Sequence, residues 1–164
     1  MKKLVALIFG LGLMVTANAN VHEIKGQVME IIDGNTLIVK SADESYYKVV
    51  LFGIDCPEMG QKYGDKAKKC LERLLKKQNV TVQFQGKDRA GNYLAIVTTD
   101  KNLDPRIQLL EEGLAWTSEN EQVADLENFK SVAQQKGKGL WREKEPTPPW
   151  VFRRQQSMMQ AKQS

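Results

Sequence analysis

The sequence is poor in the side chains that most often hold a zinc ion. Its 164 residues include one histidine, His22, and two cysteines, Cys56 and Cys70. A structural zinc site needs four ligands, usually cysteine and histidine at close spacing. Three such residues, spread along the chain, do not supply them. The composition therefore excludes a zinc site of the usual kind.

The sequence also lacks an apolar run long enough to span a bilayer. Its one candidate, Leu4 to Val15, is shorter than the roughly 20 apolar residues that a transmembrane helix needs. This run follows the basic start 1–3 and precedes the small residues 16–19, which is the order of regions in a secretory signal peptide. We therefore predict a signal peptide at residues 1–19 and a periplasmic or secreted protein without a membrane span. The alternative is a leader retained as an N-terminal anchor.

Positive charge is in short supply for a protein that binds nucleic acid. The chain has 24 Lys and Arg against 20 Asp and Glu, and loss of Lys2 and Lys3 with the leader leaves 22 basic residues, a net charge of +2. We therefore expect DNA or RNA to be bound weakly and in a salt-sensitive way. The basic residues form local clusters, which are also typical of the solvated faces of helices. These clusters are Lys66, Lys68, Lys69, Arg73, Lys76 and Lys77, then Lys136 and Lys138, then Arg153 and Arg154.

Export would place both cysteines in a compartment where disulfides persist. Cys70 shares a helical face with Tyr63, Ala67 and Leu74, which favours a buried and reduced thiol. A disulfide between Cys56 and Cys70 is the alternative, because the sequence does not fix the distance between their α-carbons.

Hydrophobic periodicity predicts one domain of five strands and three helices, without internal repeats. Two short strands surround the turn within residues 31–39, and further strands are predicted at 46–54, 79–84 and 93–98. Helices are predicted at 61–77, from the cap Asp104 to the stop Gly113, and at 121–135. The tail at residues 155–164, rich in Gln, Ser and Met, is predicted to be disordered. This order suits a small α+β barrel with helices packed on it.

The most informative segment is an apolar strand that runs into two carboxylates. Residues 49–58 read Val-Val-Leu-Phe-Gly-Ile-Asp-Cys-Pro-Glu. Pro57 fixes one backbone torsion and has no N–H, so the strand must end near it and leave Asp55 and Glu58 at the strand mouth. Carboxylates in that place can ligate a cation and activate water. A plain turn with a capping acid is the simpler alternative.

Motifs on both sides of this segment point to one family. Upstream lies the turn Asp33-Gly34-Asn35, downstream Tyr63-Gly64 opens a helix, and near the end come Gly137-Lys138-Gly139-Leu140-Trp141 and Pro148-Pro149-Trp150. In this order and at these separations, the chain resembles the staphylococcal nuclease (thermonuclease-like) family. The resemblance implies a five-stranded OB-fold β-barrel with three packed helices over residues 20–154. It also implies a calcium-dependent hydrolase of DNA and RNA.

The resemblance assigns site residues, and three of the five catalytic positions depart from the family's pattern. Both strand-end acids are present as Asp55 and Glu58. The family's acid in the hairpin turn falls on Asn35, and its two phosphate-binding arginines fall on Val50 and Asn92. The implied assignments are Glu58 as the catalytic residue, Asp55, Asn35 and Cys56 as calcium ligands, and no retained phosphate-binding arginine.

These replacements predict an attenuated site. The neutral carbonyl of Asn35 weakens a calcium site whose affinity depends on ligand charge, and neither Val50 nor Asn92 offers a guanidinium to a phosphate. We predict a monomeric, weak or inactive nuclease-like protein that binds calcium weakly or not at all. One alternative is an active nuclease in which Lys48 and Arg89 stand in for the arginines. Another is a non-catalytic module of the cell envelope that binds nucleic acid or an unknown protein partner.

Overall fold

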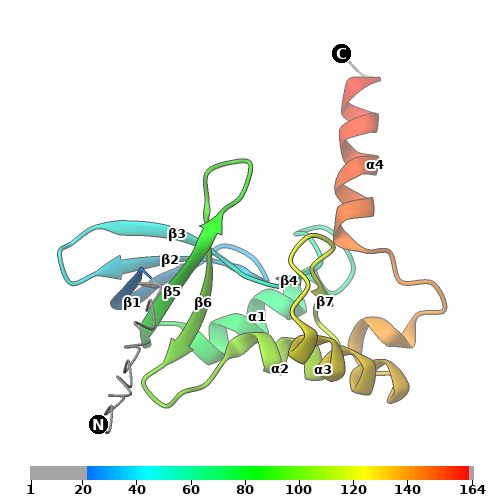
Figure 1. Cartoon of the computed structure of the whole chain (residues 1–164). Helices are drawn as coiled ribbons and strands as arrows, with labels where there is room; N and C mark the ends of the chain where they lie inside the picture. The colour runs from blue at the N-terminus through cyan, green and yellow to red at the C-terminus, as the bar shows by residue number, and fades with distance from the viewer. Residues whose placement is uncertain (1–21, 163–164) are drawn as a thin grey trace, which may run out of the picture.

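A closed five-stranded barrel forms the centre of the protein (Figure 1). The computed structural model describes residues 22–162, so the predicted signal peptide at 1–19 lies outside the described residues. The strand order is β1-β2-β3-β6-β5, with antiparallel neighbours except for the parallel pair β3–β6. The strands are β1 (Glu23–Ile31), β2 (Thr36–Ser41), β3 (Tyr46–Leu51), β5 (Asn79–Lys87) and β6 (Tyr93–Thr99). The predicted α+β barrel is therefore confirmed.

Helices cover one side of the barrel, and a last helix projects from the body (Figure 1). They are α1 (Gly64–Leu75), α2 (Pro105–Glu111), α3 (Ala124–Gln135), the 3-10 turn η1 (Gly139–Arg142) and α4 (Pro149–Ala161). A two-stranded sheet of β4 (Ile54–Asp55) and β7 (Trp116–Thr117) lies between barrel and helices. Within residues 22–162, no helix has the length and apolar character needed to cross a membrane.

The fourth helix differs from the sequence prediction of three helices and a disordered tail at 155–164. Residues 155–161 instead continue α4. Pro149 stands at the start of this helix, where its missing N–H costs nothing. The residues that follow are mainly Arg, Gln, Met and Ala, which favour helix, with no Gly or Pro among them. Composition alone suggested disorder because these residues are also mostly polar.

Alternation along β3 separates the core from an outward face. Val49 and Leu51 are buried in the barrel, whereas Lys48 is exposed and Val50 is half-buried on the opposite face. The apolar side of α1, with Ala67 and Leu71, closes the core from outside. Val50 therefore faces away from the core.

Close backbone contacts hold the acidic loop against the barrel and α1. A Cβ atom on Gly34 would lie 2.6 Å from the Cβ of Cys56 and 2.7 Å from the Cβ of Ala67. A Cβ atom on Gly64 would lie 2.2 Å from the carbonyl oxygen of Glu58. Real Cβ atoms do not approach other atoms so closely, so only glycine fits at these two places. The β1–β2 turn, the loop 55–58 and the start of α1 are thereby fixed together.

Both cysteines are free and buried in the structure, which agrees with the prediction for Cys70. Their residues are 2 % and 4 % exposed for Cys56 and Cys70, and burial raises the pKa of both thiols. Protonated, buried thiols react slowly with electrophiles. We expect both to resist alkylation in the native protein and both to be alkylated once it is denatured without a reductant, as measured by intact mass. A pair that stays unmodified under denaturing conditions would reveal a disulfide and contradict this expectation.

Candidate active site

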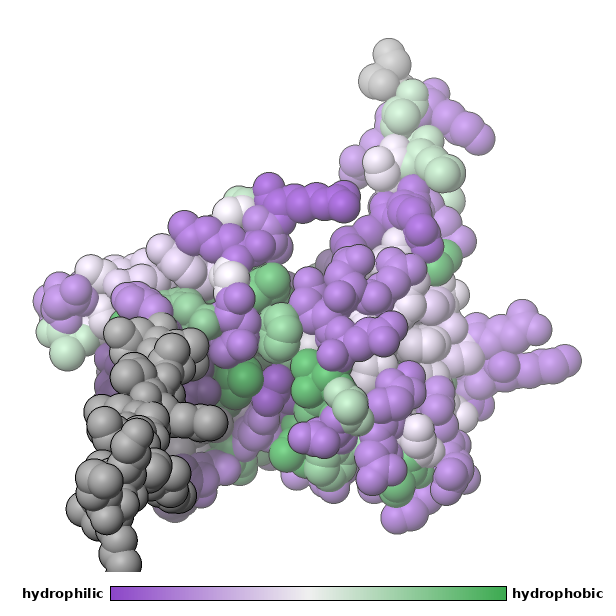
Figure 2. Space-filling model, viewed as in Figure 1, coloured by the Kyte–Doolittle hydropathy of each residue, from purple (hydrophilic) through white to green (hydrophobic). Residues whose placement is uncertain are grey.

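A cleft of about 910 Å³ lies at one end of the barrel, between the β5–β6 turn and α4. Hydrophilic residues border the hollow between these two elements (Figure 2). The cleft brings together seven of the eight residues that the sequence singled out, although they are spread over four separate stretches of chain. Those seven are Asn35, Lys48, Val50, Asp55, Glu58, Arg89 and Asn92. Cys56 is the exception, because its side chain points into the core.

One arginine binds both acidic side chains. Arg153 of α4 donates from Nη1 to Asp55 Oδ1 at 3.1 Å and from Nη2 to Asp55 Oδ2 at 2.7 Å. The same Nη1 donates to Glu58 Oε1 at 2.6 Å. Charge-assisted contacts of this bidentate kind are stronger than neutral hydrogen bonds. The guanidinium thus binds both oxygens of Asp55 and one of Glu58, so a cation would have to compete with it for them.

Burial and Arg153 act on Asp55 in opposite directions. Removal from water raises the pKa of the Asp55 carboxyl, and the hydrogen bonds and charge of Arg153 lower it. The neighbouring charges of Glu58 and Asp33 raise it again, so that the pKa of Asp55 is above its ordinary value. The carboxylates raise the pKa of Arg153 in turn, and it stays charged. The contact with Arg153 therefore favours the ionised form of Asp55.

The first turn of α4 is anchored close to the acidic loop. Trp150 packs edge-on against Trp116, with 5.7 Å between ring centroids, and Trp116 pairs with Asp55 in the β4–β7 ladder. Just before the helix, the carbonyl of Thr147 accepts a hydrogen bond from Gln61 Nε2 at 2.6 Å. Arg153 follows Trp150 by three residues, which places both on one face of α4. The tryptophan contact thus orients the arginine toward the cleft.

The three replaced positions face the cleft but carry no positive charge. Asn92 Nδ2 donates to Asp88 Oδ2 at 2.7 Å, and the Asn92 main-chain N–H donates to Asp88 Oδ1 at 2.9 Å. Asn92 therefore closes the turn 88–92 and does not reach toward a substrate. The main-chain N–H of Asn35 donates to Asp33 Oδ1 at 2.9 Å in the β1–β2 turn. Val50 offers only methyl groups to the cleft.

The donor set as arranged does not fit a calcium ion. Calcium takes six to eight oxygen ligands, yet across residues 22–162 no three His, Cys, Asp or Glu side chains lie close enough together to hold a metal. Asp55 and Glu58 already bind Arg153, and Asn35 is neutral. Calcium takes oxygen ligands, so the thiol of Cys56, which is buried in the core, offers it none.

Comparison with known proteins decides the family. The family described as Staphylococcal nuclease homologue matches residues 48–143, more than half of the chain. This chain belongs to the staphylococcal nuclease family. The match includes the acidic loop, the turn 88–92 and η1, so it spans the elements that build the cleft except the β1–β2 turn, β2 and α4.

Curated proteins similar to this chain cover most of its length. A Haemophilus influenzae protein named uncharacterized endonuclease is 34% identical over 136 residues, which are 82% of this chain and 76% of that protein. The protein ParB of Escherichia coli is 30% identical over 156 residues, 88% of each chain. A micrococcal nuclease of Shigella flexneri is 29% identical over 145 residues, 80% of this chain and 82% of its own.

Arg153 was not recognised from the sequence as part of the site. It was counted only within a basic cluster, because 95 residues separate it from Glu58 and spacing does not predict where a terminal helix docks. The available signal was local: an arginine three residues after a tryptophan, on a segment that opens with two prolines.

Proposed function

We propose that this protein is an exported nucleic-acid phosphodiesterase of the staphylococcal nuclease family whose activity is attenuated. The observation that carries the proposal is the pair Asp55 and Glu58, which stands in the cleft with a single arginine bound to both. Two family members similar to this chain are named endonuclease and micrococcal nuclease, which supports nucleic acid as the substrate. Attenuation is supported by Asn35, Val50 and Asn92 at the replaced positions.

The retained groups support slow hydrolysis. Once Arg153 releases it, the Glu58 carboxylate can accept a proton from a water molecule that attacks phosphorus. Lys48 and Arg89 line the same cleft and bring positive charge to a phosphate. A lysine ammonium lacks the planar fork of an arginine, and Arg89 is exposed at the turn. Because loss of one preorganised donor costs roughly 10² to 10³ in rate, two missing arginines predict slow turnover.

Calcium has at most a weak role in this proposal. By resemblance it is the family's metal, but Asn35 removes one ligand charge and Arg153 competes for Asp55, the one remaining ligand carboxylate. We therefore propose calcium binding in the millimolar range or weaker, comparable with weak extracellular sites.

A non-catalytic role is favoured by one observation and is the second candidate. The cleft contains the cations Lys48, Lys87, Arg89 and Arg153, which can neutralise phosphates without hydrolysing them. In that role Arg153 would compete between the two carboxylates and the nucleic-acid backbone. Binding without turnover would then be the whole function of the cleft.

A hydrolysis assay on residues 20–164 tests the proposal. We expect slow cleavage of single-stranded DNA and RNA that falls by at least about a hundredfold in Glu58→Gln, because this variant removes the proton acceptor. Glu119→Gln is the matched control, since Glu119 is an exposed carboxylate at the rim of the same cleft.

Three outcomes decide between the candidates. Equal loss in both variants, or no loss in either, would contradict the role of Glu58. Binding of an oligonucleotide without any cleavage would favour the non-catalytic candidate.

Export is proposed from the leader at 1–19, and the intact mass of protein recovered from the periplasm or medium would show whether the leader has been removed.

A further inference from the structure

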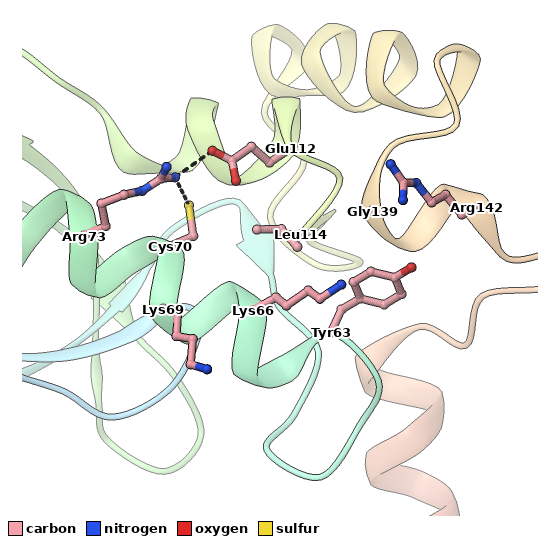
Figure 3. A pocket seen from close by; sticks show the side chains of 9 residues that line it. All are labelled: Tyr63, Lys66, Lys69, Cys70, Arg73, Glu112, Leu114, Gly139 and Arg142. Carbon is pink, nitrogen blue, oxygen red and sulfur yellow. Dashed lines mark hydrogen bonds and ion pairs between the residues drawn. The ribbon is translucent and has the colours of Figure 1, made fainter.

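A second cavity lies away from the cleft, between α1, the end of α2 and η1 (Figure 3). Its volume is about 440 Å³, and none of its lining residues also lines the cleft. We call it the α1–η1 pocket. It contains four cationic side chains and one carboxylate: Lys66, Lys69, Arg73, Arg142 and Glu112.

The one carboxylate already accepts two hydrogen bonds on one of its oxygens. Glu112 Oε1 accepts a hydrogen bond from Arg73 Nη2 at 2.7 Å and another from Gln108 Nε2 at 2.8 Å. Within the described residues 22–162, no ion pair joins Lys66, Lys69 or Arg142 to an acidic side chain. All three are exposed at the pocket. The α1–η1 pocket thus has an excess of three positive charges.

Backbone contacts fix the wall that presents Arg142. A Cβ atom on Gly139 would lie 2.2 Å from the carbonyl oxygen of Gly113, so η1 meets the end of α2 without space for a side chain. The Leu140 N–H donates to the same Gly113 oxygen at 2.8 Å. Gly139 has a φ of +51°, which favours glycine. Arg142 therefore extends from a fixed turn and not from a loose loop.

The opposite wall contains the aromatic ring of a residue whose backbone conformation is unusual. Tyr63 precedes α1 with a φ of 71°, a conformation that bulky residues rarely adopt. The Lys66 ammonium lies 4.8 Å from the centroid of its ring, within the range of a cation–π contact. Buried Leu114 and Cys70 form the apolar floor. In Figure 3, Lys66 and Arg142 extend from opposite sides, with Leu114 between α1 and η1.

Neighbouring cations on α1 repel one another in the free protein. Lys66 and Lys69 are three residues apart on α1, and Arg73 follows Lys69 by four, so like charges are neighbours on one helix face and destabilise it. An anion bound in the pocket would offset the repulsion between these cationic side chains. Unpaired cations beside an aromatic ring and an apolar floor are the features with which proteins bind single-stranded nucleic acid without sequence preference.

We propose that the α1–η1 pocket is a second binding site for a nucleic-acid strand, in which Lys66, Lys69 and Arg142 neutralise backbone phosphates. This inference rests on the proposed function, which supplies nucleic acid as the ligand. The loop that carries Glu58 leads directly into Tyr63, so pocket and cleft lie along one continuous segment. The pocket would bind phosphates of the same strand away from the cleft, where positions 50 and 92 carry no positive charge.

Binding of a fluorescent single-stranded oligonucleotide, measured in chelator over a range of salt concentrations, tests the site. In the triple variant Lys66→Gln, Lys69→Gln and Arg142→Gln, we expect about tenfold weaker binding at low salt. The slope of log affinity against log salt should become shallower by about 2, because each phosphate neutralised on a single strand contributes roughly 0.7. Circular dichroism of this surface variant confirms its fold.

The matched control is Lys25→Gln, Lys101→Gln and Lys162→Gln, which removes the same charge from three exposed positions outside both cavities. Equal weakening in the two variants, or an unchanged salt slope, would overturn the second site. Hydrolysis reports on the proposed function separately. Absent hydrolysis with pocket-dependent binding rejects the nuclease and keeps the site, whereas hydrolysis with pocket-independent binding rejects only the site.

Discussion

Restoring the three replaced positions together, as Asn35→Asp, Val50→Arg and Asn92→Arg, is expected to raise nuclease activity by at least about a thousandfold. A single phosphate-binding arginine contributes roughly 10³ to 10⁵ in rate in phosphoryl transfer. Each single substitution should give little, because groups that act as a unit are strongly non-additive. An arginine should have little effect unless the carboxylate at position 35, which would help to hold the metal, is restored as well. Initial rates of oligonucleotide cleavage in calcium provide the measurement.

The structure indicates that the scaffold accepts these changes. Val50 is half-buried on the outward face of β3 and lines the cleft, so an arginine there extends toward substrate and does not enter the core. Asn92→Arg loses the side-chain hydrogen bond to Asp88, but the main-chain N–H of Asn92 still donates to that carboxylate. Asp88 remains available as a partner for the new guanidinium.

The control for the restored variant carries uncharged side chains at positions 50 and 92. Asn35→Asp with Val50→Gln and Asn92→Gln keeps the polarity of the new side chains and removes their charge, so it should stay near the activity of the unmodified protein. A folded arginine variant that is no faster than this control would show that the cleft has lost more than these three groups.

Replacing Arg153 by glutamine is expected to strengthen calcium binding by about tenfold. The guanidinium contacts both carboxylates, so a cation must displace it or tolerate its charge nearby. Two charges about 4 Å apart interact by roughly 1 kcal/mol even in bulk water and by more near a protein surface, and about 1.4 kcal/mol corresponds to tenfold in affinity. Isothermal titration calorimetry with calcium measures the change.

The neighbouring arginine gives a matched control. Arg154 lies on the same helix, is exposed and makes no ion pair in the part of the chain that the structure describes, so Arg154→Gln should leave calcium affinity unchanged. Arg153→Gln should also raise the pKa of Asp55 further, because the contact that lowers it is gone. Equal calcium affinity in the two variants would contradict competition by Arg153.

Local patterns were sufficient to predict most elements of the fold. Asp104 caps α2 as predicted, accepting a hydrogen bond from the Arg106 main-chain N–H at 3.0 Å, and Pro105 begins the helix. Gly113 ends that region with a φ of +66°. The strand predicted at 46–54 contains β3, Tyr46–Leu51. Each of these features depends on a few adjacent residues, so the sequence contains the whole signal.

Local sequence patterns did not predict the contacts between distant segments of the chain. The parallel pairing of β3 with β6 and the docking of α4 on the acidic loop both join residues far apart in the chain. Arg106 shows the same limit: it is 6 % exposed, binds Asp104 and donates to the carbonyl of Phe52 at 3.0 Å. A charged residue near a helix start is expected to be solvated, and only the tertiary structure shows it buried.

Closure of the barrel separates the evolution of the cleft from the evolution of the fold. All five strands have partners on both sides, so neither edge is left to pair with another chain. The side chains that keep the barrel together point inward, whereas those at Asn35, Val50 and Asn92 point outward. Surface substitutions that break no cap or hydrogen-bond network usually change the free energy of unfolding by less than about 0.5 kcal/mol. The catalytic activity of the cleft can therefore change or disappear during evolution with little effect on the stability of the domain.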